Sequence, residues 1–488
     1  MIAGDIPFDA SQAAARPGLP EFPADLRWVN RREPPRLSEW RGQVVLMLFW
    51  NGSSASSSNL LGELRQLEKR LPRAFVPVCV HTPRYASQQS DTAVLKAAHR
   101  ERLRAAVAND HAWLAWKQFA ITAWPTALLI DANGCLAARL TGEGRGAEIE
   151  DAIIQLRDAM SADHAGPGPA SVPQRDLRGE PATPLAFPAH ALATESKLFV
   201  SDTGHHRVLE CTLDGRVLRQ FGSGTPGHWD GNASACGMQS PQGLAIQRNV
   251  LYVADTGNHC VRRIRLDGGD VDTVLGSGRP AYANVEEQGG GLRVAINAPH
   301  ALAAEGDVLY VAATGQHQIL RADLRQQRVT TLAGDGRSDV RDGIGAQSSL
   351  SQPMALAALP GQLIVADAGG NAIRRLRLAD LALTTLVGAS PWDTGNRDGA
   401  GTNVRLAYPC GVAASQERVY VADTCNDRLC ALNPYSGELA TLQFDYPLHE
   451  PQGLSFAGGV LWVADRNDHA ILRIDPEHET CERVAVDE

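Results

Sequence analysis

The sequence predicts a multidomain protein in which an α/β domain is followed by an all-β, six-bladed propeller. Three observations carry this prediction. The chain has 488 residues, more than one hydrophobic core usually supports. An apolar segment at 44–50, VVLMLFW, has the pattern of a strand buried on both faces. One short pattern, an apolar pair, Val, usually Ala-Asp and a polar turn, then recurs six times between Leu198 and Ile474.

Residues 1–30 are interpreted as an N-terminal extension. They contain neither a basic segment nor an apolar core, so we expect no secretory signal. No apolar run of about 18 residues occurs, and we expect no membrane partner. The net charge of −9 provides no basic surface for nucleic acid. Nine cysteines without a Cys-x-x-Cys pair fit reduced thiols, so we expect a cytoplasmic protein.

The α/β domain is predicted to span residues 31–162. The apolar strand is followed by NGSSASSSN, whose serines can cap a helix, and then by leucines at helical spacing. A second buried strand, FVPVCVHTP, begins at Phe75. Further on, a proline-containing bend leads into a strand, a turn at Asn133-Gly134 and a pairing strand, and Glu148 to Met160 supplies a closing helix.

Residues 163–184 are rich in Pro, Ala and Gly, and are predicted to be an extended linker. The propeller is predicted for residues 185–488. Each copy of the repeat reads as a β-hairpin, as in LYVADTGNHCVRRI from Leu251. A strand introduced by proline precedes each hairpin and another strand-like segment follows it. Four short strands in each unit form a propeller blade, and six units close a ring.

An aspartate recurs in five of the six copies, and Ala313 replaces it in the third. Five equivalent carboxylates are better explained as acceptors of backbone N–H bonds at turns than as catalytic groups. Histidines 205, 206 and 259 lie in the blade turns and are expected to be exposed. The aspartates are Asp202, Asp255, Asp367, Asp423 and Asp465.

The blades differ at the residue just before the Gly/Ala-hydrophobic pair of the first strand. Because inner strands line the central channel of a propeller, we expect this position at the channel mouth. Its occupants, in blade order, are His190, Gln242, His300, Met354, Cys410 and Gln452. His190, His300 and Cys410 fall on alternate blades, and three N/S donors with an open fourth position are typical of catalytic zinc. A simpler interpretation is that Cys410 is a filler and the polar residues hold water.

The repeat resembles the NHL repeat, which has a Pro-x-Gly-hydrophobic strand followed by V-A-D-x-x-N-x-x-I. The chain as a whole resembles the NHL-repeat-containing thioredoxin-like proteins. Matching stretches in the first domain are LSEWRGQVVLMLFW from Leu37, VANDHAWLAWKQFAITAWPT from Val107 and Gly142-Glu143-Gly144. The resemblance implies a thioredoxin-like domain with a cis proline at Pro125. It also implies a groove for extended chain, with Trp50, Trp124 and Pro125 as candidate residues.

The redox position of this family is altered in the chain. Redox-active relatives carry a cysteine pair after the Phe-Trp strand, whereas this sequence has Ser53, Ser54, Ala55, Ser56 and Ser57. Serine can cap the helix, but it forms no disulfide and is far harder to ionise than a thiol. A Ser54 nucleophile activated by His81 is a weaker interpretation, since no Gly-x-Ser-x-Gly elbow occurs.

The sequence therefore predicts a non-catalytic scaffold that binds a protein or peptide. Two enzymatic alternatives remain. One is a metal-dependent lyase or hydrolase at the channel mouth, with zinc as its cofactor. The other is a thiol–disulfide oxidoreductase, as in the cysteine-containing relatives, that uses another cysteine such as Cys79 or Cys135. Both of these are more often inert than nucleophilic in such positions.

Overall fold

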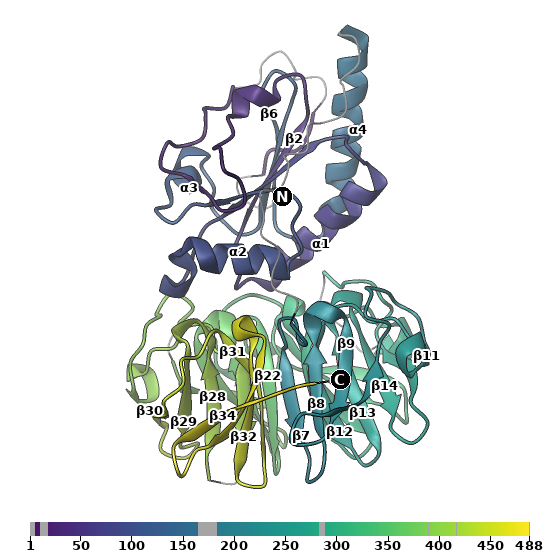
Figure 1. Cartoon of the computed structure of the whole chain (residues 1–488), viewed down its shortest axis with the longest axis vertical. Coiled ribbons are helices and arrows are strands. Elements are labelled where there is room, and N and C mark those ends of the chain that lie inside the picture. Colours follow the sequence, from purple (N-terminus) through teal and green to yellow (C-terminus); the bar gives the residue numbers. More distant parts are fainter. Residues whose placement is uncertain are drawn as a thin grey trace. The chain divides into compact units, whose positions relative to one another are not determined.

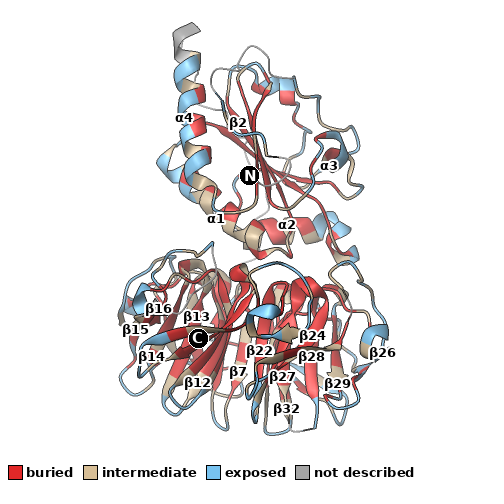
Figure 2. Cartoon of the chain, turned by 180° about the vertical axis from the view of Figure 1, so that it is seen from behind, coloured by how far each residue is buried: buried red, intermediate tan, exposed pale blue. Residues whose placement is uncertain are grey.

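The chain folds into two compact units, Met1–Pro181 and Ala182–Glu488 (Figure 1). The computed structural model describes residues 5–9, 18–163, 183–282, 288–388, 390–415 and 417–487. Most of the predicted linker, 163–184, lies outside these residues. Within the described ranges, no helix is long and apolar enough to cross a membrane. Buried residues are concentrated in the strands of each unit (Figure 2).

The first unit is built on a six-stranded sheet with the order β1-β4-β3-β2-β5-β6. β2, β3 and β4 are parallel, whereas β1, β5 and β6 run antiparallel to their neighbours. β1 lies within the predicted N-terminal extension, so part of that segment belongs to the sheet. The strands are β1 (Arg27–Trp28), β2 (Val45–Trp50), β3 (Val76–His81), β4 (Ala106–Asn109), β5 (Thr126–Ile130) and β6 (Leu136–Thr141).

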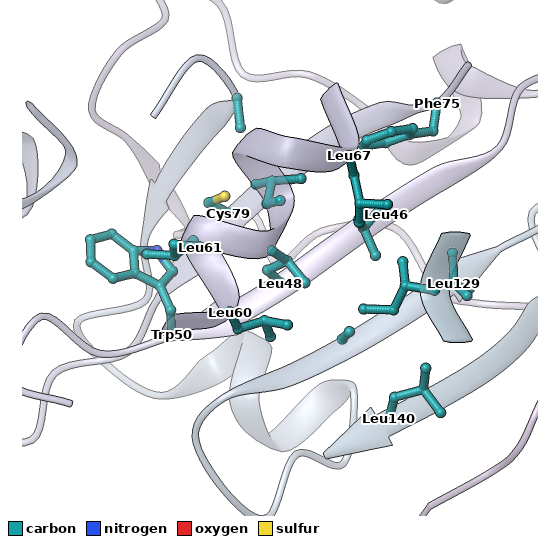
Figure 3. Close-up of a cluster of buried hydrophobic side chains, with 14 of the residues drawn as sticks. Leu46, Leu48, Trp50, Leu60, Leu61, Leu67, Phe75, Cys79, Leu129 and Leu140 are labelled. Carbon is teal, nitrogen blue, oxygen red and sulfur yellow. The ribbon is translucent and has the colours of Figure 1, made fainter. Parts of the chain in front are cut away.

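The residues of β2 alternate between two hydrophobic clusters, because successive side chains of a strand point to opposite faces. Leu46, Leu48 and Trp50 pack in the cluster that includes residues of α1 and α4 (Figure 3). The intervening residues face a second cluster, which contains Trp40 and Phe119. The helices are η2 (Leu37–Trp40), α1 (Ala55–Arg70), η3 (Ala86–Gln89), α2 (Asp91–Arg100), α3 (Leu114–Gln118) and α4 (Gly146–Asp163).

The second unit is a six-bladed β-propeller, as predicted. Each blade is an antiparallel sheet made from one contiguous segment of the chain. In blades 2 to 5, a two-residue strand from the preceding loop also pairs with the outer strand. This fifth strand was not expected from the sequence.

The first three blades occupy residues 190–333. Blade 1 contains β7 (His190–Ala193), β8 (Leu198–Asp202), β9 (Arg207–Cys211) and β10 (Val217–Phe221). Blade 2 contains β11 (Gly231–Asn232), β12 (Pro241–Gln247), β13 (Val250–Asp255), β14 (Cys260–Arg265) and β15 (Asp270–Leu275). Blade 3 contains β16 (Gln288–Gly289), β17 (Pro299–Glu305), β18 (Val308–Ala313), β19 (Gln318–Asp323) and β20 (Arg328–Ala333).

The last three blades occupy residues 343–484. Blade 4 contains β21 (Gly343–Ile344), β22 (Pro353–Leu359), β23 (Gln362–Asp367), β24 (Ala372–Arg377) and β25 (Ala382–Val387). Blade 5 contains β26 (Gly399–Ala400), β27 (Gly411–Ala414), β28 (Val419–Asp423), β29 (Arg428–Leu432) and β30 (Glu438–Thr441). Blade 6 contains β31 (Pro451–Ala457), β32 (Val460–Asp465), β33 (Ala470–Asp475) and β34 (Thr480–Val484).

The ring closes by packing of the first blade against the last. One hydrophobic cluster joins them and contains Val200 and Leu209 of blade 1 with Trp462 and Ile471 of blade 6. A parallel bridge between Arg216 and Asp487 adds the C-terminal residues to blade 1. Both end blades have four strands of their own, so the ring closes by contacts between two complete sheets and not by a strand shared between them.

A side chain in the turn of each blade also binds the next blade. This turn residue has a left-handed φ between 50° and 57°. Its imidazole Nδ1 or side-chain oxygen accepts a backbone N–H from the segment that opens the next blade, at 2.7–3.1 Å. We call these six contacts the interblade joint. The acceptors are His206, His259, His317, Asn371, Asp427 and His469.

The joint corrects the expectation that the blade-turn histidines are exposed. His206 is buried, and His205 and His259 are half-buried. His206 Nδ1 accepts the backbone N–H of Ser240 at 2.9 Å, and His259 Nδ1 accepts that of Ala298 at 3.1 Å. These side chains point toward the neighbouring blade, which the sequence of a single repeat does not reveal.

The recurrent aspartates hold the same framework together. Each accepts through Oδ1 a backbone N–H from a residue 16 positions earlier, in the segment that opens its blade. They therefore accept backbone bonds, but from that segment and not from their own turn. Asp367 also forms a fully buried ion pair with Arg374, at 2.9 Å. In blade 3, where Ala313 replaces the aspartate, Gln316 Oε1 accepts the N–H of Asn297.

Candidate functional site

The segment after β2 carries the serines that stand at the predicted redox position. Ser54 is the N-cap of α1, and its Oγ accepts the backbone N–H of Ser57 at 3.1 Å. Ser57 is fully buried, and its own Oγ accepts the backbone N–H of Asn51 at 3.2 Å. The two hydroxyls thus support the start of the helix and the end of the strand.

Neighbouring polar side chains hold the other two serines. Gln88 Nε2 donates to Ser53 Oγ, and Ser56 Oγ donates to Glu143 at 2.8 Å. Gln88 Oε1 also accepts from Asn51 Nδ2 at 3.1 Å. Sequence reasoning missed Gln88 and Glu143 as parts of this site. These hydrogen bonds fix the loop, and Arg100 adds a charged donor to the carbonyl oxygen of Gly52 at 3.0 Å.

His81 is not placed as a base for Ser54. Its Nε2 accepts the backbone N–H of Gly52 at 3.2 Å. The imidazole also lies edge-on to Trp50, with ring centroids 4.9 Å apart. A general base needs its acceptor nitrogen directed at the hydroxyl it deprotonates. The serine-nucleophile hypothesis therefore does not fit this arrangement.

The two cysteines of the first unit lie away from the start of α1. Cys79 is fully buried in β3, and burial raises the pKa of its thiol well above the ordinary value. Cys135 is half-buried in the turn between β5 and β6. Since thiol exchange requires an accessible thiolate, Cys79 in particular is unsuited to it.

The residues proposed for a binding groove divide into two groups. Trp50 is 1% exposed and packs beside Leu61 in the core, so its assignment to a groove is wrong (Figure 3). Its place in β2 turns the side chain to the helix-covered face. Trp124 is half-buried and joined to Pro125 by a cis peptide bond. Phe49 pairs with Thr126, which places Pro125 beside the end of β2.

Trp124 belongs to a group of three half-buried indoles, which we call the tryptophan cluster: Trp113, Trp116 and Trp124. Their ring centroids are 4.6–5.3 Å apart. Asp110 orients the cluster, because its carboxylate accepts the backbone N–H groups of Ala115 and Trp116 at 3.0 and 2.8 Å. Sequence reasoning missed Trp113 and Trp116. The available signal was the concentration of three tryptophans between residues 113 and 124.

The second candidate site is the mouth of the propeller channel. A cavity of about 350 Å³, which includes space open to solvent, is lined by residues of all six blades. Gln452 Nε2 donates to Gln242 Oε1 at 3.0 Å across the cavity wall. The lining includes the six residues singled out from the sequence: His190, Gln242, His300, Met354, Cys410 and Gln452.

His190 links three blades and has no nitrogen left for a metal. Its Nδ1 accepts the N–H of Leu244 at 2.9 Å, and its Nε2 lies 3.0 Å from the carbonyl oxygen of Leu454. Gly453 permits this approach, because a Cβ there would lie 2.5 Å from His190 Cδ2. Burial lowers the pKa of His190 to about 4, so the ring is neutral and Nε2 donates.

The other two proposed zinc ligands are also engaged with the backbone. His300 Nδ1 donates to the carbonyl oxygen of Ala298 at 2.9 Å, and the Cys410 thiol donates to that of Tyr408 at 3.4 Å. Among the described residues, no group of three or more His, Cys, Asp or Glu side chains is arranged to hold a metal. The zinc hypothesis for His190, His300 and Cys410 therefore does not fit this arrangement.

Comparison with known proteins identifies an NHL repeat at residues 238–264, in blade 2. The chain is similar to NHL repeat-containing protein 2 of Bos taurus, with 29% identity over 95% of this chain and 70% of the relative. It is also 29% identical to Protein SUPPRESSOR OF QUENCHING 1, chloroplastic, of Arabidopsis thaliana, over 94% of this chain and 46% of that protein. Among solved structures, the nidogen/laminin complex matches 59% of this chain and 92% of that chain, with 15% identity and a TM-score of 0.41.

Proposed function

We propose that this protein is a non-catalytic scaffold that binds a protein or peptide partner. In this proposal the first unit is a thioredoxin-like domain whose redox cysteines are replaced by serines. The parallel strands β2 to β4, the antiparallel β5–β6 hairpin and the helix that follows β2 support this fold. Similarity to NHL repeat-containing protein 2 over 95% of the chain supports the NHL propeller of the second unit.

The observation that carries the proposal is the position of Ser54. It caps α1 and accepts the N–H of Ser57, where the helix dipole and backbone N–H groups would stabilise a thiolate. A hydroxyl at this place forms the same hydrogen bond but neither ionises near neutral pH nor forms a disulfide. The site thus keeps the local structure of a redox centre without its reactive group.

The tryptophan cluster, which lies beside the buried Pro125, is the surface we assign to partner binding. Half-buried indoles expose apolar area, and they lose little side-chain entropy on binding. Tryptophan is also enriched among the residues that dominate binding energy at interfaces. The rigid loops of the propeller would supply additional contacts.

Selection of displayed random peptides on the full chain tests the proposal. Selected peptides should lose at least about 10-fold in affinity for the Trp124→Ala and Trp116→Ala variants. Trp392→Ala is the matched control, because this tryptophan lies on the propeller and is 78% exposed. Peptides that bind all these variants as tightly as the original chain would exclude the tryptophan cluster as the binding surface.

A redox assay separates the scaffold from a thiol–disulfide oxidoreductase. The chain should reduce insulin no faster than a variant with Cys79 and Cys135 replaced by serine. Turnover above that control would show that another thiol has taken over the chemistry, and the scaffold proposal would fail.

A further inference from the structure

The first unit holds a proline-rich segment of its own chain against aromatic side chains. Residues 18–23 have the sequence GLPEFP, and residues 19–23 form neither a helix nor a strand. Leu19 and Phe22 are half-buried and pack against the hydrophobic cluster that contains Phe119. They are three residues apart, and a polyproline II helix has three residues per turn, so such a helix presents both side chains on one side.

The contacts to this segment come from α3 and the residue that follows it. Gln118 Nε2 donates to the backbone carbonyl oxygen of Glu21, and the ring centroids of Phe22 and Phe119 are 6.2 Å apart. A polyproline II helix has no internal hydrogen bonds, so its carbonyl oxygens are open to donors of this kind. This end of α3 therefore binds a proline-rich backbone within the protein itself.

The tryptophan cluster continues this aromatic surface. Trp116 packs against the same hydrophobic cluster as Phe22. Its ring centroid lies 4.6 Å from that of Trp124 and 5.1 Å from that of Trp113, and the ring planes are inclined by 47° and 65°. Inclined rings leave furrows between them instead of one flat face. Proline-rich segments bind aromatic-lined grooves of this kind, because the short pyrrolidine rings fit between the aromatic side chains.

The backbone holds the tryptophan cluster in a fixed arrangement. Trp113 has a left-handed conformation, with φ 61° and ψ 27°, which is unfavourable for a residue with a Cβ. The buried Asp110 maintains it, because its carbonyl oxygen accepts the N–H of Trp113 at 2.9 Å and its carboxylate accepts those of Ala115 and Trp116. Strain that the surroundings maintain is typical of binding sites. A fixed cluster and a stiff polyproline II segment both lose little conformational entropy when they associate.

We propose that the tryptophan cluster binds a proline-rich segment of a partner protein in the polyproline II conformation. The inference rests on the proposed function and specifies the chemistry of the partner. The partner segment would lie beside the chain's own residues 18–23 and would use the same kind of contact, with its proline rings in the furrows of the cluster. The continuity of this surface with the one that already holds residues 18–23 favours a proline-rich occupant over a helix or a β-strand.

Binding of three fluorescein-labelled peptides to the full chain tests the proposal. Decaproline forms a polyproline II helix, an alternating Ser-Thr decamer is extended without proline, and an amphipathic Leu-Lys peptide is helical. Fluorescence anisotropy should give decaproline a Kd of about 100 μM or lower, and at least about 10-fold weaker binding of the other two. Equal affinity for the three peptides, or no decaproline binding below about 2 mM, would overturn the proposal.

Substitutions of Trp116 locate the binding. Trp116→Ala should weaken decaproline binding at least about 10-fold, whereas Trp116→Phe keeps a flat ring and should weaken it only about 2–3-fold. Trp392→Ala, at a tryptophan of the second unit that is 78% exposed, is the matched control and should bind like the original chain. Unchanged binding by Trp116→Ala would show that the peptide binds elsewhere and would overturn the inference. If that variant does not fold, Trp113→Ala is judged by the same outcomes.

The selection of displayed peptides separates this inference from the proposed function. Selected peptides that are rich in proline and lose affinity for Trp116→Ala would support both. Selected peptides without proline that lose affinity for the same variant would support the tryptophan cluster as the binding surface and overturn the polyproline II inference. Selected peptides that bind independently of the cluster would overturn both.

Discussion

Replacing His317 with asparagine is expected to preserve the stability of the propeller near pH 8 and to reduce its sensitivity to acid. His317 Nδ1 accepts the backbone N–H of Gln352 at 3.1 Å in the interblade joint, and it can do so only while unprotonated. Asn371 makes the same contact in blade 4, where its Oδ1 accepts the N–H of Tyr408 at 3.0 Å. The two turn residues have φ values of 57° and 51°. Asparagine therefore keeps the contact and removes the titrating group.

The size of the effect follows from the pKa of His317. Burial lowers this pKa to about 4, whereas histidine in an unfolded chain has a pKa of about 6.5. Because the folded value is the lower one, the contribution is complete above about pH 6.5 and is lost as the pH falls toward 4. The loss is about 2 kcal/mol at pH 5 and about 3 kcal/mol once the pH is below 4. Asp335 lies close enough to oppose part of the shift.

Urea unfolding of both proteins between about pH 8 and pH 5, followed by far-UV circular dichroism, measures this difference. Burial also raises the pKa values of Asp367 and Asp423 to about 6, which favours the folded state as the pH falls. That contribution is common to both proteins and cancels in the comparison. His317→Ala should be destabilised at both pH values, because alanine loses the bond and disfavours the left-handed turn. The reasoning is refuted if the original chain and His317→Asn lose the same free energy of unfolding.

Three further predictions concern the two cores and the serine loop. Arg374→Met should lower the free energy of unfolding by about 3–5 kcal/mol in urea titrations, since it leaves the Asp367 carboxylate buried without its cation; a loss below about 1 kcal/mol would contradict a buried pair. Trp50→Ala should lower the free energy of unfolding by about 3–5 kcal/mol in the same assay, because it truncates a core side chain. A near-neutral change would show that Trp50 is not buried in the core. A Ser54→Cys, Ser57→Cys double variant should gain a thiol that iodoacetamide alkylates with a pKa below about 8.5. An alkylation rate equal to that of the unmodified chain would argue against a thiolate-stabilising position.

The architecture was predictable because each of its parts is encoded locally. The six repeats contain the apolar alternation of their own strands, and the order of the blades follows the order of the repeats. The segment from Val44 to the leucines of α1 likewise combines a strand pattern with a helix pattern. The two-residue outer strands, such as β21, were not predictable, because two residues carry no periodicity.

The candidate sites were only partly predictable. The six channel residues were found because equivalent positions of a repeat meet at the centre of a ring. The hydrogen bonds of these residues were not predictable. They show that His190 has no nitrogen available for zinc and that Gln452 has an unpaired oxygen. Trp50 was misassigned because a tryptophan at a strand end looks the same in sequence whether it faces a helix or solvent.

The amino-acid sequence by itself determined the number of blades, the strand that precedes α1 and the absence of thiols at residues 53–57, because identity and local periodicity carry that information. The tertiary structure alone decided which polar side chains are partnered. Those partners lie far apart along the chain, as in the bond between His469 and Phe187, which are separated by 282 positions. Closing the ring brings such residues together, and the resulting burial sets the pKa of a histidine or leaves a carboxamide oxygen without a donor.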